Sequence, residues 1–310
     1  MPEAWKVPHL VKGLLTRVPP LAAWRANRGE HAAPPRYCYA VWLRHLVLLA
    51  EHGFRPAGAR VAELGPGASL GVGLAALLGG AVSYTGLDVV AHAARQDLVA
   101  ALEALAALLA RGEPIPDERE FPLLRPRLDG YAFPDGLVDR SRVAARAAAA
   151  REALVLGPGR WPALAYRAPW RLADLGPDSL DLVLSQGVLQ SVDDPAGVYR
   201  AMGAWLRPGG LGSHVLDLGA AGTAPWWNGH WAYTERQWRV VRGRRPYLVN
   251  RLPLGEHLAL AAQAGLEVVR VVREEAPGAL PAEKLAAPFR GLDDAERRTR
   301  RATVVLRRPA

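Results

Sequence analysis

The chain has 310 residues, of which 50% are hydrophobic, so it is long enough to bury a substantial core in one large domain or two modest ones. Its formal net charge of +9 would suit an anionic partner, but 36 of the 39 basic residues are Arg. We interpret that excess as a compositional bias at least as much as a nucleic-acid signal. The single cysteine, Cys38, excludes an internal disulfide and a multi-cysteine metal site, and we predict no bound metal.

The N-terminal part is expected to be a helical extension, residues 1–52, ahead of one α/β domain over residues 53–310. It lacks the apolar core of a signal peptide, and nowhere in the chain do 18 apolar residues run without a charge. We therefore expect a cytoplasmic protein without a transmembrane segment. Val7 to Val18 is weakly amphipathic, which suits either a short helix packed on the domain or a segment resting on a membrane surface. Pro19-Pro20 and Pro34-Pro35 interrupt helix in this extension.

The most informative stretch is a predicted strand, turn and helix between Arg60 and Gly73, which reads R-V-A-E-L-G-P-G-A-S-L-G-V-G. Gly65 and Gly67 allow the positive φ of a tight turn and the close approach of a ligand to bare main chain. A helix is expected over Leu70 to Leu78, and its N-terminal amides would point back at that ligand. This arrangement is the nucleotide-binding half-site of a doubly wound α/β fold.

The spacing within this turn separates two classes of nucleotide cofactor. A dinucleotide fingerprint needs a third small residue where Leu70 stands, so that fingerprint is incomplete. The remaining pattern, acidic-x-G-x-G formed by Glu63, Gly65 and Gly67, resembles motif I of the class I S-adenosylmethionine-dependent methyltransferases. The next predicted strand ends at Asp88, whose carboxylate suits the two vicinal ribose hydroxyls of either cofactor. A nicotinamide-dependent oxidoreductase is therefore the alternative that Leu70 disfavours.

A second block resembles motifs IV to VI of the same family. From Asp178 the chain reads D-S-L-D-L-V-L-S-Q-G-V-L-Q-S-V-D-D-P, which predicts a buried strand followed by a turn and a helix that continues to Leu206. The turn Arg207-Pro208-Gly209-Gly210 then leads into a strand over Leu211 to Leu216. Gln190-Ser191 departs from the acidic-His pair that many members carry, so no catalytic His is assigned from this motif.

The resemblance covers about residues 60–217 and implies a doubly wound α/β fold with a mostly parallel, seven-stranded sheet and S-adenosylmethionine as the cofactor. It implies that the glycine turn lines the methionine and ribose portions. The ends of the second and third strands would hold ribose and adenine, and the fourth strand would end beside the sulfonium. The residues assigned in this way are Glu63, Gly65, Gly67, Asp88, Pro169, Trp170 and Gln186. Helix packing is the alternative role for Trp170.

Two segments are additions to a minimal fold of this kind. Residues at about 112–161 separate a predicted helix over His92 to Arg111 from the third strand, Leu164 to Tyr166. We interpret them as a substrate-covering insertion or one that forms a homodimer, with surface decoration as the alternative. Their second half, Asp139 to Leu156, predicts an Ala-rich helix. A helix over Tyr37 to His52 precedes motif I, where relatives close over the cofactor. Its candidate lid residues are Tyr39, Trp42 and Arg44, with packing as the alternative for Trp42.

Aromatic and polar residues alternate in a loop at about residues 218–250, which follows the carboxyl end of the fifth strand. Open α/β sheets bind ligands at that edge. Aromatic faces with Arg and Asn donors suit a sugar, a flat ring or an anion, and the alternative is an aromatic satellite core under a long loop. The rings concerned are Trp226, Trp227, Trp231, Tyr233, Trp238 and Tyr247. Beyond them, a helix over Pro253 to Ala264 and strands over Leu266 to Val272 and Ala302 to Leu306 fit the closing hairpin of such sheets.

Methyl transfer from a sulfonium mainly needs an oriented acceptor and a dry site, but an oxygen or nitrogen acceptor can require a general base. The candidate bases are His214 and Asp217 at the end of the fifth strand and His230 in the aromatic loop, with a buried core role as the alternative for His214. We predict methylation of an oxygen, or less favourably a nitrogen, on a small molecule or saccharide. The alternatives are a nucleic-acid methyltransferase and a non-catalytic cofactor-binding or interaction protein.

Overall fold

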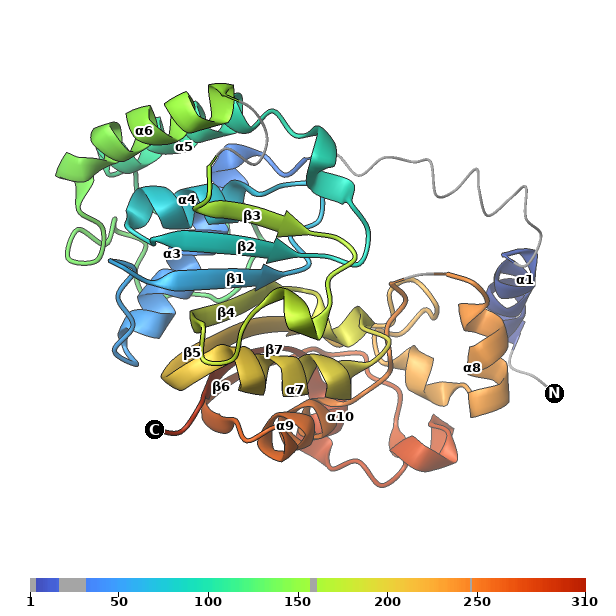
Figure 1. The fold of residues 1–310 in the computed structure, drawn as a ribbon. Helices are drawn as coiled ribbons and strands as arrows, with labels where there is room; N and C mark the ends of the chain where they lie inside the picture. The colour runs from blue at the N-terminus through green and yellow to red at the C-terminus, as the bar shows by residue number, and fades with distance from the viewer. Residues whose placement is uncertain (1–3, 17–31, 157–160, 246) are drawn as a thin grey trace.

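The computed structural model describes residues 4–16, 32–156, 161–245 and 247–310. At its centre is a seven-stranded sheet with the order β3-β2-β1-β4-β5-β7-β6 (Figure 1). The strands are β1 (Arg60–Leu64), β2 (Ser83–Leu87), β3 (Leu164–Arg167), β4 (Leu180–Gln186), β5 (Leu206–Asp217), β6 (Glu267–Glu275) and β7 (Thr299–Arg307). β7 alone runs antiparallel to its neighbours, β5 and β6. The predicted doubly wound sheet and its closing hairpin are confirmed.

Helices cover both faces of this sheet (Figure 1). One face carries α3 (Pro35–Ala50), α4 (Gly71–Gly79), α5 (Leu98–Arg111) and α6 (Val143–Val155). The other face carries α7 (Pro195–Trp205), α9 (Leu254–Gln263) and α10 (Asp294–Arg298). Two further helices, α1 (Val7–Leu15) and α8 (Glu235–Arg242), lie together beyond the carboxyl ends of the strands. The predicted break at Pro19-Pro20 and the end of the insertion at 157–160 fall outside the described residues.

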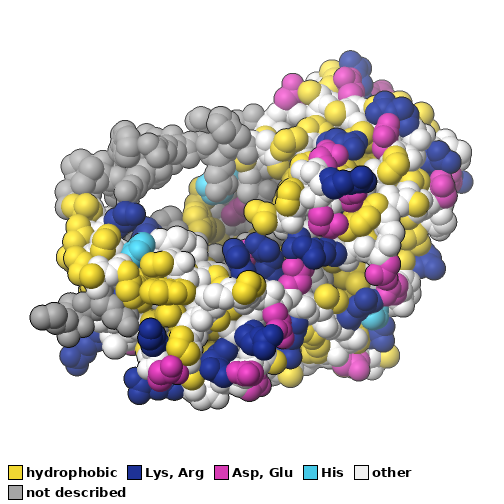
Figure 2. Space-filling model, turned by 180° about the vertical axis from the view of Figure 1, so that it is seen from behind, with side chains coloured by type: hydrophobic (Ala, Val, Ile, Leu, Met, Phe, Trp, Pro, Cys, Tyr) yellow, Lys and Arg dark blue, Asp and Glu magenta, His cyan; other side chains and the backbone are white. Residues whose placement is uncertain are grey.

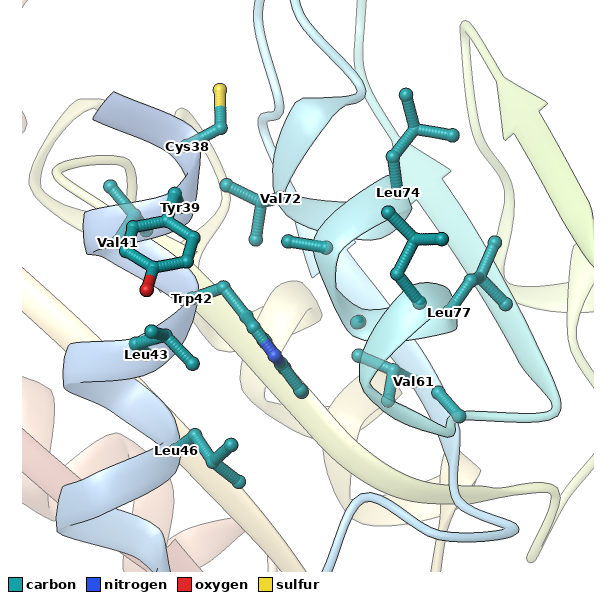
Figure 3. Packing of buried hydrophobic residues seen from close by; sticks show 14 of the residues in the cluster. Cys38, Tyr39, Val41, Trp42, Leu43, Leu46, Val61, Val72, Leu74 and Leu77 are labelled. Carbon is teal, nitrogen blue, oxygen red and sulfur yellow. The ribbon is translucent and has the colours of Figure 1, made fainter. Parts of the chain in front are cut away.

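The packing of α4 shows how the first face becomes a core. All 9 residues of this helix are apolar or glycine, and all are buried, as expected for a helix enclosed on every side. A Cβ on Gly73 would lie 2.4 Å from the Tyr84 ring, so glycine is required for α4 to approach β2 this closely. Trp42 and Leu46 of α3 close the same core against Val72 of α4 (Figure 3).

The helix expected to carry lid residues, α3, is a core helix. Tyr39, Trp42 and Arg44 are each 0% exposed, so packing is the role of Trp42. Arg44 is a buried charge, and groups of the insertion accept hydrogen bonds from its two terminal nitrogens. These groups are the carbonyl oxygens of Pro116, Leu124 and Pro126 and the carboxylate of Glu118. A buried guanidinium therefore fastens the irregular first half of the insertion to α3.

The insertion also reaches the edge of the sheet where the parallel strands end. Arg125 pairs with Glu274, the second-last residue of β6. The carbonyl oxygen of Arg125 accepts a hydrogen bond from Gln186 Nε2 at 3.3 Å. The second half of the insertion forms α6, as predicted, and α6 lies against α5. Asp139 caps the short turn that precedes α6 by accepting from the Ser141 N–H at 3.1 Å.

Candidate functional site

The glycine turn after β1 has the backbone that the sequence predicts. Gly65 and Gly67 have φ values of 63° and 62°, a region that favours glycine. A Cβ on Gly65 would lie 2.7 Å from a Val188 methyl carbon, so this turn directly contacts the segment that follows β4. The first and fourth strands therefore end at one continuous site.

Asp88, the carboxylate predicted to hold a ribose, lies against this turn. Its Oδ2 accepts the Gly67 N–H at 3.1 Å, and its Oδ1 accepts the Val89 N–H at 2.7 Å. An ionised carboxylate has about four acceptor positions, so both oxygens keep capacity for ligand hydroxyls. The structure thus brings together Asp88 and the glycine turn as the sequence predicts.

The N-terminus of α4 is capped by side chains of the protein itself. The Leu70 N–H donates to Gln96 Oε1 at 2.6 Å, and the Gly71 N–H donates to Ser69 Oγ at 3.2 Å. Gln96 Nε2 also donates to Ser69 Oγ, which ties the two capping groups together. A dinucleotide pyrophosphate would need these amides. The capping therefore disfavours a dinucleotide on grounds independent of the sequence spacing.

Glu63, predicted to face the cofactor, is instead directed into the core beneath the turn. It is 3% exposed and accepts a hydrogen bond from the Tyr84 hydroxyl at 2.5 Å. The pKa of Glu63 is raised to about 8, mainly by burial and also by the nearby Asp88 charge, against the lowering effect of the Tyr84 hydrogen bond. Glu63 therefore supports the turn from within, beside α4.

Pro169 and Trp170, predicted to contact adenine, are tied to the end of β2. The Trp170 N–H donates to the carbonyl oxygen of Asp88 at 3.1 Å. The indole of Trp170 meets Trp205 of α7 edge-on, with ring centroids 5.3 Å apart. This contact is the helix packing that was the alternative role for Trp170.

Gln186, the last residue of β4, is held by a buried histidine that sequence reasoning did not single out. His45 of α3 bonds Gln186 Oε1 through Nε2 at 3.0 Å and Ser213 Oγ through Nδ1 at 2.7 Å. Burial lowers the pKa of His45 to about 4, so the ring is neutral, with Nε2 donating and Nδ1 accepting. The available signal was the adjacent pair Arg44-His45, two polar residues within the apolar run of α3.

Two of the three candidate bases are enclosed. His214 is 0% exposed, and its Nδ1 bonds Ser185 Oγ at 2.9 Å. His230 is 1% exposed and lies against the Trp231 ring at 5.0 Å. Burial lowers the pKa of each histidine to about 3, so both are neutral core residues without access to a substrate. For His214, a buried core role is the alternative that the sequence left open.

Asp217, the third candidate base, lies on a cavity of about 510 Å³ beyond the ends of β4 and β5. Its Oδ1 accepts the Gly219 N–H at 3.0 Å, and its Oδ2 pairs with Arg301 at 3.1 Å. Six residues that shape this cavity are Gln190, Asp217, Trp226, Trp227, Val249 and Arg300. We call it the edge cavity.

The aromatic loop divides into two groups of rings. Trp231, Tyr233 and Trp238 are buried in satellite clusters, as the alternative interpretation predicts, and Trp226 and Trp227 pack against one of these clusters while lining the edge cavity. Tyr247 is exposed and meets His92 with ring centroids 6.1 Å apart. The N-terminal segment, residues 4–16, covers this loop. Trp5 meets the Trp226 and Tyr233 rings at 5.6 and 5.2 Å, and Lys6 Nζ donates to the Ala232 carbonyl oxygen at 2.7 Å.

In the part of the chain that the structure describes, no helix combines the length and the apolar character needed to cross a membrane. No protein-family model and no curated protein matches the chain.

Solved structures with a similar fold include an S-adenosylmethionine-dependent methyltransferase from Mesorhizobium loti, which is 19% identical. The match covers 86% of this chain and 98% of that chain, with a TM-score of 0.44. A methyltransferase of the same kind from Methanosarcina mazei is 12% identical over 84% and 97% of the two chains, with a TM-score of 0.44. The [4+2]-cyclase SpnF is 14% identical over 87% and 82%, with a TM-score of 0.41. The strand order of the sheet is that of an open, doubly wound α/β fold.

Proposed function

We propose that this protein transfers a methyl group from S-adenosylmethionine to an oxygen, or less favourably a nitrogen, of a small molecule or saccharide. The observation that carries the proposal is the contact of Asp88 with the Gly67 N–H at the carboxyl edge of this sheet, beside an α4 N-terminus that the protein caps itself. That combination offers acceptors for a ribose, whereas the Leu70 and Gly71 amides that a pyrophosphate would use already donate to Gln96 and Ser69.

The residues of the chain supply binding and orientation. Asp88 would hold the ribose hydroxyls, and Gln186, fixed by His45, would border the sulfonium. S-adenosylmethionine, when bound, supplies a methyl group that is already activated for in-line displacement. Asp217 is the candidate base that lines the edge cavity, and in this proposal it takes a proton from the acceptor during the transfer step.

The charge distribution argues against the nucleic-acid alternative. Figure 2 shows Lys and Arg side chains interspersed with Asp and Glu over the face that it draws. Several surface arginines are paired, including Arg36 with Glu120, Arg151 with Glu103 and Arg270 with Glu51. A phosphate backbone is bound by a continuous basic stripe, which such pairing interrupts.

Isothermal titration with S-adenosylhomocysteine and, separately, with NAD tests this proposal. We expect binding of S-adenosylhomocysteine and a loss of about 10- to 100-fold in Asp88→Ala, the scale of hydrogen bonds to a charged group. Asp181→Ala is the matched control, because Asp181 also accepts a main-chain N–H, that of Arg60 at 2.8 Å, but at the opposite edge of the sheet. Binding of NAD alone would overturn the proposal, and binding of neither compound would favour the non-catalytic alternative.

A further inference from the structure

The edge cavity contains polar atoms whose hydrogen-bonding capacity is unused. Gln190 Oε1, Trp227 Nε1 and Arg300 Nε are buried and have no hydrogen-bond partner among the described residues. All three side chains line this one cavity. Buried polar groups without partners are uncommon in folded proteins and cost free energy, and three of those in the described residues belong to side chains that line this one cavity.

Arg300 differs from the arginines on either side of it. Arg298 pairs with Glu275 at 2.5 Å, and Arg301 pairs with Asp217 at 3.1 Å. Arg300 forms no ion pair with any residue that the structure describes, although it stands at the start of β7 beside the cavity. Because Arg301 offsets the Asp217 charge, the guanidinium of Arg300 leaves the cavity with an excess positive charge. The Trp227 N–H is a second donor in the same space.

Gln190 supplies a hydrogen-bond acceptor, whereas Arg300 and Trp227 supply donors. It is 8% exposed, and its Nε2 donates to the Gly187 carbonyl oxygen at 2.7 Å. That bond fixes the orientation of the amide, so Oε1 remains as an acceptor that needs a donor. Gln190 lies two residues after Val188, which touches Gly65 of the glycine turn. The short segment after β4 therefore contacts the glycine turn through Val188 and lines the edge cavity through Gln190.

We propose that the edge cavity is the methyl-acceptor site and takes a small organic anion. Its carboxylate or phosphate group binds Arg300 and the Trp227 N–H, and its hydroxyl or amine donates to Gln190 Oε1. Trp226 and Trp227 contact the body of the molecule between these ends, and the volume lies within the range of about 300 to 1,000 Å³ typical of small-molecule sites. This inference rests on the proposed methyltransferase function.

The test is titration of the protein, saturated with S-adenosylhomocysteine, with 4-hydroxybenzoate, phenyl phosphate and the neutral 4-hydroxybenzyl alcohol. At least one of the two anions should bind at least 10-fold more tightly than the alcohol. The Arg300→Met variant should lose that preference for anions. Its affinity for S-adenosylhomocysteine should stay the same as that of the native protein, which also shows that the variant is folded. Arg298→Met is the matched control and should keep the preference, because Arg298 lies outside the cavity.

Other outcomes would overturn the inference. These are failure of both anions to bind, equal affinity for anions and alcohol, or equal losses in the two arginine variants. The proposed function fails separately: if the protein binds the anion through Arg300 but does not bind S-adenosylhomocysteine, the anion site stands and the methyltransferase function is refuted. The two failures are therefore distinguishable in one set of titrations.

Discussion

At the scale of single residues, the buried Glu63 makes stability depend on pH. Its pKa is raised from the ordinary 4.5 to about 8, so the folded protein holds this proton more tightly than the unfolded chain does. The resulting stabilisation is complete below about pH 4.5 and is lost as the pH rises to about 8. We predict that the free energy of unfolding of the native protein, relative to Glu63→Gln, falls by roughly 1.4 kcal/mol per pH unit in this window. Urea unfolding of both proteins at pH 5, 6.5 and 8 measures this difference in the free energy of unfolding.

Comparison with the variant removes other titrations from this measurement. Burial lowers the pKa values of His45 and His257 to about 4, so their contributions change in the same way in both proteins. Glu152→Gln, on an exposed part of α6, is the control and should show no such trend. A difference between native protein and Glu63→Gln that stays constant from pH 5 to 8 would contradict the assignment of a buried, protonated Glu63.

Residue roles were predictable where local sequence determines position. Gly65, Gly67 and Asp88 occur at strand ends, and the chain direction in a doubly wound sheet brings strand ends together. His214 and His230 were not predictable in this way. Strand alternation alone does not say which of the two helical layers His214 of β5 faces. The enclosure of His230 depends on how the aromatic loop folds back on itself, because Trp231 and Trp238 of the same loop lie against it.

At the scale of elements, Arg44 connects α3 to the insertion. Arg44→Met would remove the guanidinium that donates to the carbonyl oxygens of Pro116 and Pro126. The Leu124 carbonyl oxygen and the Glu118 carboxylate would each lose one of two donors, because Arg125 and Tyr131 also donate to them. We expect a loss of about 3 to 5 kcal/mol in the free energy of unfolding, the usual cost of breaking a buried charge network.

Arg36→Met is the matched control, because Arg36 also joins α3 to the insertion, through Glu120, but its side chain is 42% exposed. It should cost at most about 1 kcal/mol in the same urea experiment. Equal losses would contradict the anchoring role.

The elements themselves were largely predictable, and their interruptions were less so. The helix predicted over His92 to Arg111 is divided at Gln96 and Asp97 in the structure. Asp97 caps α5 by accepting the Ala100 N–H at 3.0 Å, and Gln96 leaves the helix to cap α4. The start of α5 after Asp97 follows a local rule for N-caps. The position of Gln96 outside the helix depends on its partner Leu70, 26 residues away, which periodicity does not reveal.

At the scale of the whole molecule, the described chain has two parts, the layered sheet and the aromatic loop covered by residues 4–16 (Figure 1). The order of the motifs predicted the first part because it resembles that of a known family, although the central strands pair residues far apart in the chain, such as Val61 of β1 with Leu182 of β4. The second part depends on contacts between residues more than 200 positions apart, such as that of Lys6 with Ala232. Amphipathicity indicated that the N-terminal helix packs on something, but it did not identify α8 as the partner.

Gly13 tests how these two distant segments are joined. A Cβ on Gly13 would lie 1.8 Å from the Val240 carbonyl oxygen and 2.7 Å from that of Val241, both of which are main-chain atoms of α8. Alanine is the better helix former by about 0.5 to 1 kcal/mol, so in an isolated helix Gly13→Ala would stabilise α1. Here it should separate α1 from α8. We expect hydrogen exchange to accelerate at least 10-fold over residues 7–15 while exchange in the buried α4 stays unchanged.

Gly255→Ala in α9 is the control for this prediction. There the nearest atoms, which belong to Glu296, lie 3.5 Å or more from the added Cβ, an ordinary contact. This variant should be as stable as the native protein or more stable, because it gains helix propensity without a clash. If Gly13→Ala behaves like Gly255→Ala, with slow exchange over residues 7–15, then close contact between α1 and α8 does not hold the N-terminal segment over the aromatic loop. If exchange accelerates in α1 alone, that contact is what joins the two parts of the molecule.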